Sequence, residues 1–545
     1  MLRQPARRNP GRVGQGGSQF AGGASIKPPV GGWDAVSPLA DMPDDRAPLL
    51  DNWFPQPGYV EVRRGHQVFA DTTEIGPVES LMVWNGLTAA TSKMFACGSE
   101  TVYDITAGGY AVSEFSCTNN RWQWVNFTTA GGKFLWMCNG ADDPRHYNGT
   151  VWATPAITGI TPTDIINVNA HKNRLWFILK DSTKAAYLAT SAVAGAATEF
   201  QLGGFLSRGG YLVAMGTWTR DGGAGEDDLA VFISSRGQCI VYQGTDPASA
   251  STWSMIGVFD LGSPIGYRCF TKVAGDLALI NIDGVLPLSQ ALHTDRGAAS
   301  AIAITANINN AMNAAARSYS ANFGWQLTPY PKGTMAILNV PIIEGESQHQ
   351  YVMNTLTGAW CRFTGWDANC FVVFRDALYF GGNSGLISLA DYSSMDQSDQ
   401  VDAIGQTAYN YFSSRGALKQ WNLIQPLVTT DSDVTPSIGL STDFADNAVL
   451  STPISADTES ALYDDAIYDT DVYPQEARNT ANWTGVTGVG QAASVHFRAR
   501  TGRESGLAIW GLGTWGVSSW SLPITGDVTV RLNGFNVNYE RGGKL

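Results

Sequence analysis

The sequence lacks long apolar runs, and charged residues make up only 15% of its 545 positions. So few charges argue against a coiled coil and against general disorder. No run approaches the roughly 18 apolar residues that would cross a membrane. The first residues also have no apolar segment of the kind found in signal peptides. We therefore expect a folded chain without a membrane-spanning segment or a secretion signal.

Cysteine is scarce and has no motif spacing. There are seven cysteines, an odd number, and no two have the C-x-x-C spacing of metal or redox sites. Most lie within apolar runs, where a free cysteine behaves as a small apolar residue. The sequence therefore predicts folding in a reducing cytosol, without a disulfide framework or a zinc site.

Motifs for catalysis are also missing. The six histidines include no pair four residues apart, and there is no H-E-x-x-H, G-x-S-x-G or Walker A motif. The segment Asp221–Asp228 is acidic but lacks the alternating oxygen ligands and final glutamate of an EF-hand loop, so we expect a solvated loop there. We accordingly predict that the protein is not an enzyme and has no catalytic, metal-binding or cofactor-binding residues.

The chain is acidic, with a formal net charge of −13. Proteins that hold nucleic acid do so with basic surfaces, so the overall charge gives this chain no reason to grip DNA. The same charge suits a surface that lies beside DNA without adhering to it.

What the sequence does contain is glycine, with 60 residues, and aromatic side chains, at 11%. This composition is typical of many short strands joined by tight turns. The stretch Tyr351–Gly385 illustrates it, because Cys370–Phe374 and Ala377–Phe380 are apolar runs that flank the turn Arg375-Asp376. We predict a β-hairpin there, and similar hairpins recur along the chain.

Seven such hairpins lie within residues 79–412. Four have apolar anchors seven residues apart, namely Phe127 and Phe134, Val168 and Leu175, Phe270 and Leu277, and Phe371 and Leu378. Three fit more loosely, namely Val83 to Phe95, Leu327 to Met335, and Val213 to Leu229, the last interrupted by a polar loop at Thr219–Asp228. Their period of roughly 40–60 residues is close to that of a four-stranded propeller blade. Because one blade cannot bury both faces of its sheet, we predict an all-β fold with a β-propeller of about seven blades.

The other segments flank this ring. Residues 1–32 are predicted to be a basic flexible arm, and residues 33–78 a β segment that leads into the propeller and pairs with it. Within the propeller, about 301–320 is predicted to be an inserted helix, either packed on the flank of the ring or in contact with another subunit. Residues 413–545 alternate apolar and polar positions and are predicted to form a C-terminal β-sandwich-like domain.

Two segments are candidate sites for partners. The arm carries Arg3, Arg7, Arg8 and Arg12, and it is either a disordered tail or an arm that becomes ordered on a neighbouring protein ring or on nucleic-acid phosphate. The segment Asp457–Asp471 carries six carboxylates. It is either a solvated excursion or a loop that faces a partner or a channel.

Several short motifs within about 205–390 carry a family resemblance. They are Arg208–Tyr211, Gly216–Gly223, Val241–Pro247, Phe323–Gln326, Tyr330–Gly333, Met353–Trp360 and Tyr379–Gly382. Together they resemble the tail nozzle, or tail tubular protein B-like, family of short-tailed phages, which includes packaged-DNA stabilisation proteins. The resemblance is thin over 1–80 and 450–545, and its motifs are structural, so no active-site residue carries over.

The resemblance implies a structural virion protein of a phage tail, assembled in the host cytoplasm as a ring, usually hexameric, below the portal and adaptor rings. It implies the adaptor, or head-to-tail connector, as a direct partner, and tail fibres or spikes as further neighbours. The lumen of the ring would retain the packaged genomic DNA and conduct it during ejection, without sequence-specific binding.

Two other functions stay open from the residues. A propeller can be a binding module that recognises a host glycan or a protein partner on one face of its ring. A propeller can also be a hydrolase that gathers carboxylates from several blades at its centre. The sequence does not exclude the hydrolase, because such neighbours come from different repeats.

Overall fold

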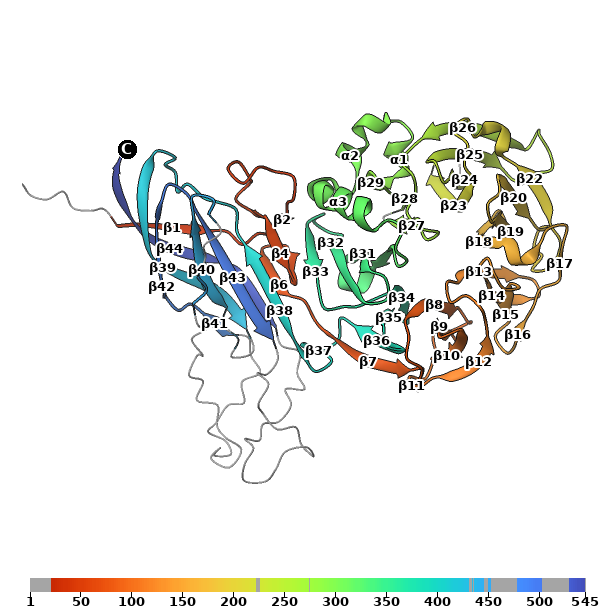
Figure 1. Ribbon diagram of the computed structural model, residues 1–545, viewed down its shortest axis with the longest axis horizontal. Helices are drawn as coiled ribbons and strands as arrows, with labels where there is room; N and C mark the ends of the chain where they lie inside the picture. Colours follow the sequence, from red (N-terminus) through yellow and green to blue (C-terminus); the bar gives the residue numbers. More distant parts are fainter. Residues whose placement is uncertain are drawn as a thin grey trace, which may run out of the picture.

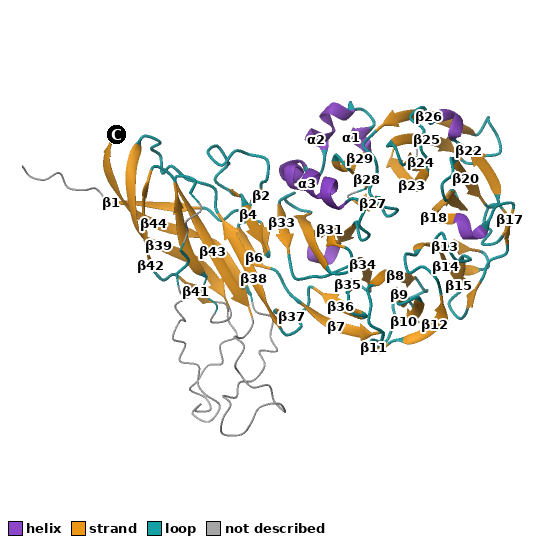
Figure 2. Cartoon of the chain, in the orientation of Figure 1, coloured by secondary structure: helices purple, strands orange, loops and turns teal. Residues whose placement is uncertain are grey.

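The computed structural model describes residues 21–221, 226–273, 275–430, 434, 436–445, 449–451, 478–501 and 529–544. It has two parts, a ring of small sheets and a β-sandwich beside it, and both consist mostly of strands (Figure 1, Figure 2). The predicted fold class, an all-β chain with a propeller and a second β domain, is confirmed by this architecture.

In the described residues, seven groups of strands stand around the ring as blades, and the sixth and seventh are joined through sandwich strands into one continuous sheet. The first blade contains β8 (Val78–Trp84), β9 (Lys93–Gly98), β10 (Thr101–Asp104) and β12 (Val112–Ser116). The second contains β13 (Gln123–Thr129), β14 (Gly132–Cys138), β15 (Arg145–Tyr147) and β16 (Trp152–Ala153). The third contains β18 (Ile165–His171), β19 (Arg174–Leu179), β20 (Lys184–Tyr187) and β22 (Thr198–Gln201). The fourth contains β23 (Leu212–Asp221), β24 (Glu226–Ser234), β25 (Gln238–Gly244) and β26 (Trp253–Asp260).

The remaining three blades complete the circle. The fifth contains β27 (Phe270–Val273), β28 (Asp276–Asn281) and β29 (Gly284–Pro287). The sixth contains β30 (Gln326–Tyr330), β31 (Met335–Ile343), β32 (Ser347–Asn354) and β33 (Trp360–Phe363). The seventh contains β34 (Cys370–Phe374), β35 (Ala377–Gly381), β36 (Leu386–Ala390) and, from far earlier in the chain, β7 (His66–Asp71).

The seven predicted hairpins form the two inner strands of the seven blades, which confirms the predicted blade number. The turns of these hairpins explain why the hairpins can be recognised from the local sequence. Lys172 and Asn173 have φ of 44° and 57°, and Arg375 and Asp376 have φ of 50° and 60°. Positive φ at both central residues is the type I′ turn, whose twist matches that of two antiparallel strands.

The ring closes through β7, which pairs antiparallel with β36 as the outermost strand of the seventh blade. The inner strands β34 and β8 then lie against each other and complete the circle. The propeller therefore begins near residue 66, whereas the sequence placed its start at 79. Segment 33–78 does pair with the propeller, through β7 and also through Asp51, which pairs with Arg362 of the sixth blade.

The loop predicted from the sequence at Thr219–Asp228 lies in the fourth blade, and its ends differ from the prediction. Its inner strands β23 and β24 remain paired as far as Asp221 and Glu226. Thr219 and Asp228 lie opposite each other in this ladder, and the hydroxyl of Thr219 donates to the Asp228 carboxylate at 2.9 Å. Most of the segment predicted as a polar loop is therefore strand, because alternate side chains along it are satisfied across the hairpin.

Short helices take the outer position of the fifth blade. They are α1 (Leu288–Ala291), α2 (Ala299–Ile302) and α3 (Asn309–Tyr319), and they lie beside β28, β29 and β31 (Figure 1). The predicted helix at about 301–320 is thus shorter and begins at Asn309. The flank position is the one observed, because Ile308 and Met312 are buried in the core of the chain.

The second part is a sandwich of two sheets. One sheet contains β1 (Ala21–Ile26), β5 (Trp53–Gln56), β6 (Tyr59–Val62), β39 (Ala417–Thr430), β41 (Arg478–Thr480), β42 (Thr484–Gly490) and β44 (Val530–Lys544). The other contains β4 (Leu49–Asp51), β38 (Asp399–Gln406), β40 (Ser437–Thr442) and β43 (Ala493–Thr501). Aromatic side chains fill the space between them, with the ring of Phe497 5.6 Å from that of Phe535 and 5.3 Å from that of Trp53.

The sandwich is built from both ends of the chain, which corrects the predicted boundaries. Residues 21–26, predicted as part of the flexible arm, form β1 and pair with β44. Residues 399–406, predicted as propeller, form β38 and pair with β43. A strand can be assigned to a domain only once its partner is known, and these partners lie far away in sequence.

Candidate functional site

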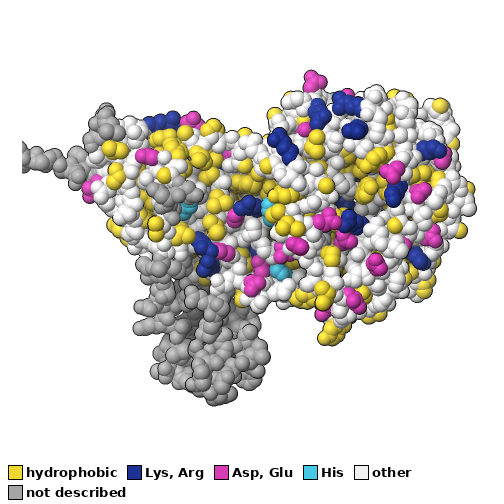
Figure 3. All heavy atoms as spheres, in the orientation of Figure 1, with side chains coloured by type: hydrophobic (Ala, Val, Ile, Leu, Met, Phe, Trp, Pro, Cys, Tyr) yellow, Lys and Arg dark blue, Asp and Glu magenta, His cyan; other side chains and the backbone are white. Residues whose placement is uncertain are grey.

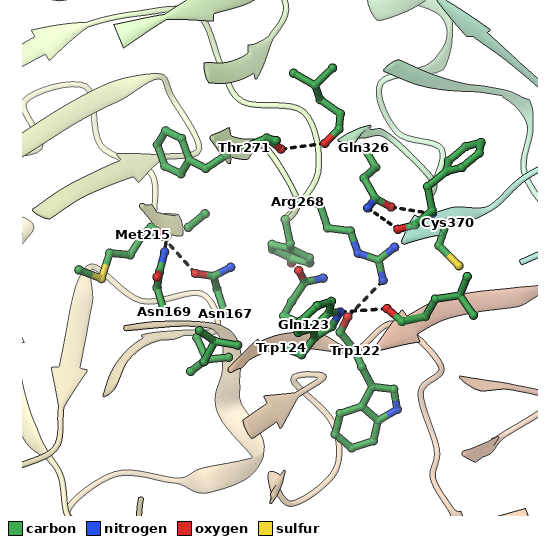
Figure 4. Close-up of a pocket in the computed structure, with 18 residues that line it drawn as sticks. Trp122, Gln123, Trp124, Asn167, Asn169, Met215, Arg268, Thr271, Gln326 and Cys370 are labelled. Atoms are coloured by element: carbon green, nitrogen blue, oxygen red, sulfur yellow. Dashed lines mark hydrogen bonds between the residues drawn. The ribbon is translucent and has the colours of Figure 1, made fainter. Parts of the chain in front are cut away.

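The seven inner strands surround a central channel. They are β8, β13, β18, β23, β27, β30 and β34, and each follows the one before it around the ring. A cavity of about 240 Å³ lies among them, and its lining includes residues from all seven blades (Figure 4). This channel is the first candidate site.

Side-chain amides connect neighbouring inner strands, which do not pair through their backbones in the described sheets. The amide of Gln326 donates to the carbonyl of Phe371 at 2.9 Å and accepts from the Phe371 N–H at 3.1 Å. Asn169 donates to the carbonyl of Met215 at 2.9 Å, and Asn167 accepts from the Met215 N–H at 3.1 Å. These amides replace the missing backbone ladder between blades, so they position the wall of the channel.

Other junctions use different donors for the same purpose. The indole N–H of Trp124 donates to the carbonyl of Leu81 at 2.9 Å, from the second blade to the first. The hydroxyl of Thr271 donates to the carbonyl of Leu327 at 3.0 Å, from the fifth blade to the sixth. The ring is therefore held by specific polar contacts as well as by packing.

Arg268 crosses the channel from the segment before β27 to the opposite blades. Its Nη2 donates to the carbonyl of Glu79 at 3.0 Å, the hydroxyl of Ser80 at 2.8 Å and the carbonyl of Trp122 at 3.1 Å. Burial lowers the pKa of this guanidinium from its ordinary value. Among the ion pairs formed by described residues, none involves Arg268. A partly buried cation therefore lies at the channel, without a carboxylate partner among the described residues.

An aromatic residue and a second arginine lie beside it. The guanidinium carbon of Arg121 lies 4.4 Å from the centroid of the Phe323 ring, and that of Arg268 lies 5.1 Å from it. Arg121 pairs with the carboxylates of Glu79 at 2.9 Å and Glu344 at 2.5 Å. Since Glu79 and Phe323 lie at the starts of inner strands, this cluster marks one end of the channel.

The channel wall is polar, and its described lining holds no carboxylate and no imidazole. Gln123 lines it instead, with only 8% of the residue exposed and no hydrogen-bond partner for its amide among the described residues. The described lining can donate hydrogen bonds and offer one positive charge. No group of three or more metal-binding side chains is found in the described part of the chain.

The junction between the two parts is the second candidate site. Arg63 follows the sandwich strand β6, and Asp396 lies in β37 (Met395–Asp396), on the way back from the propeller. Arg63 donates to Asp396 at 2.9 Å and 2.5 Å, and to the side-chain oxygen of Asn52 at 2.8 Å. His66 lies 3.0 Å from the same carboxylate. Burial alone would raise the pKa of Asp396, but Arg63 and His66 outweigh it, so the pKa is lowered.

The residues singled out from sequence are not among those that the structure describes. Arg3, Arg7, Arg8 and Arg12 fall outside the described residues, and so does the acidic segment Asp457–Asp471. Sequence reasoning missed the channel residues Gln123 and Arg268. The available signal was a glutamine within an apolar aromatic strand, a residue type that is costly to bury without a partner. No helix in the described ranges is long and apolar enough to span a membrane.

Comparison with known proteins gives distant structural likeness. No protein-family model matches the chain, and no curated protein does. The crystal structure of BBS1N in complex with ARL6DN is 10% identical, with 60% of this chain and 98% of that one covered and a TM-score of 0.38. The computationally designed Ika8 protein is 9% identical, with coverage of 59% and 99% and a TM-score of 0.34. YCF48 from Cyanidioschyzon merolae is 11% identical, with coverage of 62% and 97% and a TM-score of 0.33. Likeness at this level says nothing of function, and the fold stands on the strand pairing described above.

Proposed function

We propose that this protein is a structural component of a short-tailed phage virion, in which several copies form the tail nozzle ring that retains packaged DNA and conducts it during ejection. It is proposed to act without catalysis or cofactor. The motifs within about 205–390 that resemble the nozzle family support this, together with the architecture of the chain.

The observation that carries the proposal is the set of buried contacts that join propeller and sandwich. Both crossings of the chain between the two parts are tied by Arg63 and Asp396. A further link joins β33 to β4, where Arg362 donates to Asp51 at 2.8 Å and 2.5 Å. One continuous hydrophobic core includes residues of both parts. Such a unit transmits force without hinging, which a tube component requires.

The size of the propeller channel supports a lumen formed between copies. A cavity of about 240 Å³ has room for only about eight water molecules. A DNA duplex cannot pass through it, so a conduit has to be enclosed by several chains, and a closed ring is the common solution. Each copy brings a formal charge of −13, and a lining of the same sign as DNA favours sliding over adhesion.

The proposed partners follow from the same ring. Acidic and basic side chains are interspersed on the visible face of the described propeller, without one dominant sign (Figure 3). We assign docking on the adaptor ring to the basic arm with Arg3, Arg7, Arg8 and Arg12, and we expect tail fibres or spikes at the outer surface. Assembly would take place in the host cytoplasm, and the finished protein would reside in the virion tail.

Negative-stain microscopy and mass photometry test this proposal. The purified full chain, alone and mixed with purified adaptor ring, should give closed rings with a central lumen. A ring that closes only on the adaptor would agree with the proposal. A stable monomer in both samples would contradict it.

The second candidate is a binding module for a host glycan or protein, and the outer strand β26 favours a protein. Met255, Ile256 and Val258 on this strand are exposed, and β26 pairs only with β25 in the described sheets. An unpaired apolar edge is a template for association. A glycan array and a pull-down with monomeric protein would favour this module if they give specific binding in the absence of rings.

A further inference from the structure

We propose that the propeller channel is a binding site for a small oxyanion, a free phosphate or a short organic carboxylate, held by the Arg268 guanidinium and the Gln123 amide. This site is independent of the proposed nozzle function, because it requires only one closed propeller.

The first argument is charge. Arg268 lies at the channel with no carboxylate partner in the described residues, and the nearby acids Glu79 and Glu344 are both paired with Arg121. Arg268 is partly buried, and a charge that is partly withdrawn from water is stabilised by a counter-ion. An anion in the adjoining cavity would supply the missing charge.

The second argument is the hydrogen-bonding capacity that Arg268 keeps. All three of its hydrogen bonds use Nη2. Its Nε and Nη1 atoms have no acceptor in the described part of the protein, although both carry hydrogens. The contacts that hold the ring together therefore leave two donor positions of the cation free.

The third argument is Gln123. Other amides of the lining, such as those of Asn169 and Gln326, are used to join blades. Gln123 is nine-tenths buried, lines the cavity and has no partner among the described residues. In Figure 4 it lies in the centre of the view together with Arg268 and Trp122. The amide is accessible from the cavity and is not used to join blades, so it can donate a hydrogen bond to a molecule bound there.

The chemistry of these donors selects the ligand. A guanidinium N–H and an amide N–H both donate, and carboxylate or phosphate oxygens accept without offering a competing hydrogen. The cavity of about 240 Å³ is too small for a nucleotide, since ligand pockets for drug-sized molecules begin at about 300 Å³. Trp124 and Val125, which are partly exposed, give part of the wall an apolar character, which suits the carbon chain of a dicarboxylate.

Isothermal titration calorimetry and thermal unfolding of the full chain test the site. Potassium phosphate and sodium malonate are compared with potassium chloride at equal ionic strength. We expect saturable binding and a rise in Tm with at least one of the two oxyanions. Response to phosphate alone assigns an inorganic ion, and response to malonate alone assigns an organic carboxylate.

Three variants separate the site from a general salt effect. Gln123→Met keeps the volume but removes the donor, and should weaken the binding at least tenfold. Arg268→Met should abolish it. Arg415→Met, which removes an exposed arginine paired with Asp41, should leave it unchanged.

Arg268 also ties three residues of the first two blades, so its variant can lose stability for that reason alone. The Gln123 side chain makes no such contact between blades. If the Arg268 variant is unstable, the binding measured for Gln123→Met therefore decides whether the site exists. Absence of saturable binding by the wild type overturns the proposal. So does equal binding by the wild type and Gln123→Met.

Discussion

Arg63 and Asp396 join the two places where the chain passes between sandwich and propeller, through hydrogen bonds of 2.9 Å and 2.5 Å. Only 1% of the Arg63 side chain and 10% of that of Asp396 are exposed. The guanidinium also lies over the ring of Trp366, 5.1 Å from its centroid. The connection between the two parts therefore depends on a buried charge pair.

Asp396→Asn should destabilise the protein by about 3–5 kcal/mol, because it leaves the buried charge of Arg63 without its partner. Since Arg63 and His66 lower the pKa of Asp396, its contribution is fully present above about pH 4. It is lost as the pH falls through the lowered pKa. Urea unfolding at pH 7 measures the loss. Asp41→Asn removes an exposed pair with Arg415 and should have little effect on stability, because exposed ion pairs contribute little. Equal costs for the two variants would contradict the buried role.

Asp391 has the opposite pH dependence. Burial raises its pKa to about 6, against smaller opposing effects of Arg64 and Tyr330. The folded state thus prefers the neutral carboxyl, so stability falls as the pH rises from about 4 to 6 and stays lower above that range. Asp391→Asn should therefore stabilise the protein at pH 8 by up to about 3 kcal/mol, with little effect at pH 4.

Thermal unfolding at the two pH values measures the effect of Asp391→Asn. Asp376→Asn is the matched control, because Asp376 is exposed and has the same left-handed backbone, with φ of 60° against 54° at Asp391. A gain at pH 8 that also occurs in the control, or is absent from Asp391→Asn, would count against this interpretation.

Gln326→Leu tests the amide contacts between blades. It removes both hydrogen bonds to Phe371 and leaves a buried N–H and carbonyl unpaired, so the loss should be about 2–4 kcal/mol. Gln425 also makes two hydrogen bonds, at 2.8 Å and 3.0 Å, but near solvent. Gln425→Leu should cost less than about 1 kcal/mol, and a similar cost at both positions in denaturant unfolding would refute the special role of the channel amides.

Cys97 and Cys117 should form a disulfide on mild oxidation. Their sulfurs are 3.4 Å apart, and the hydrogen bond from Cys97 lowers the pKa of the Cys117 thiol. The Cys117 thiolate attacks the azo bond of diamide, and the Cys97 thiol then displaces the hydrazine. Two protons and two electrons are transferred for each S–S bond formed. Thiol titration in denaturant should fall from seven groups to five.

Cysteine variants check the pairing. Cys117→Ser should prevent the reaction, and Cys138→Ser should still lose two thiols on treatment, because Cys138 is buried in a neighbouring blade without a sulfur partner among the described residues. Loss of thiols in Cys117→Ser, or formation of intermolecular species instead, would contradict the predicted pair.

Two truncations separate the arm from the first strand. Removal of residues 1–20 should leave the unfolding curve unchanged and impair incorporation beside the adaptor, because Arg3, Arg7, Arg8 and Arg12 are lost. Removal of residues 1–26 should also destabilise the sandwich, because β1 pairs with β44. Normal incorporation of the shorter truncation into particles would refute the docking role of the arm.

The propeller could be predicted because its signal is local. The turn Arg375-Asp376 and its flanking apolar runs specify a hairpin on their own, and repetition of that hairpin specifies a ring. The closing strand β7 and the strand β1 could not be recognised, because their partners β36 and β44 lie hundreds of residues away. Short alternating segments without a local partner fit either domain equally well.

The candidate site was less predictable for a related reason. Gln123 lies in the second blade and Arg268 just before the fifth, and both line the same cavity. Their residue types suggest nothing when read in sequence order. The absence of common motifs does not reveal which residues form a site, since the channel wall is assembled from a few residues of each of the seven blades.

The pairing of β7 with β36 also dictates an order of events during translation. His66–Asp71 leaves the ribosome long before Leu386–Ala390 exists, and at 5–20 residues per second the delay is roughly 15–65 s. Blades one to four can form during that interval, but the circle stays open until its seventh member arrives. The first strand, β1, has to wait still longer for β44. A nascent chain interrupted before residue 390 would therefore carry an unpaired edge at its beginning, and is the species most in need of a chaperone.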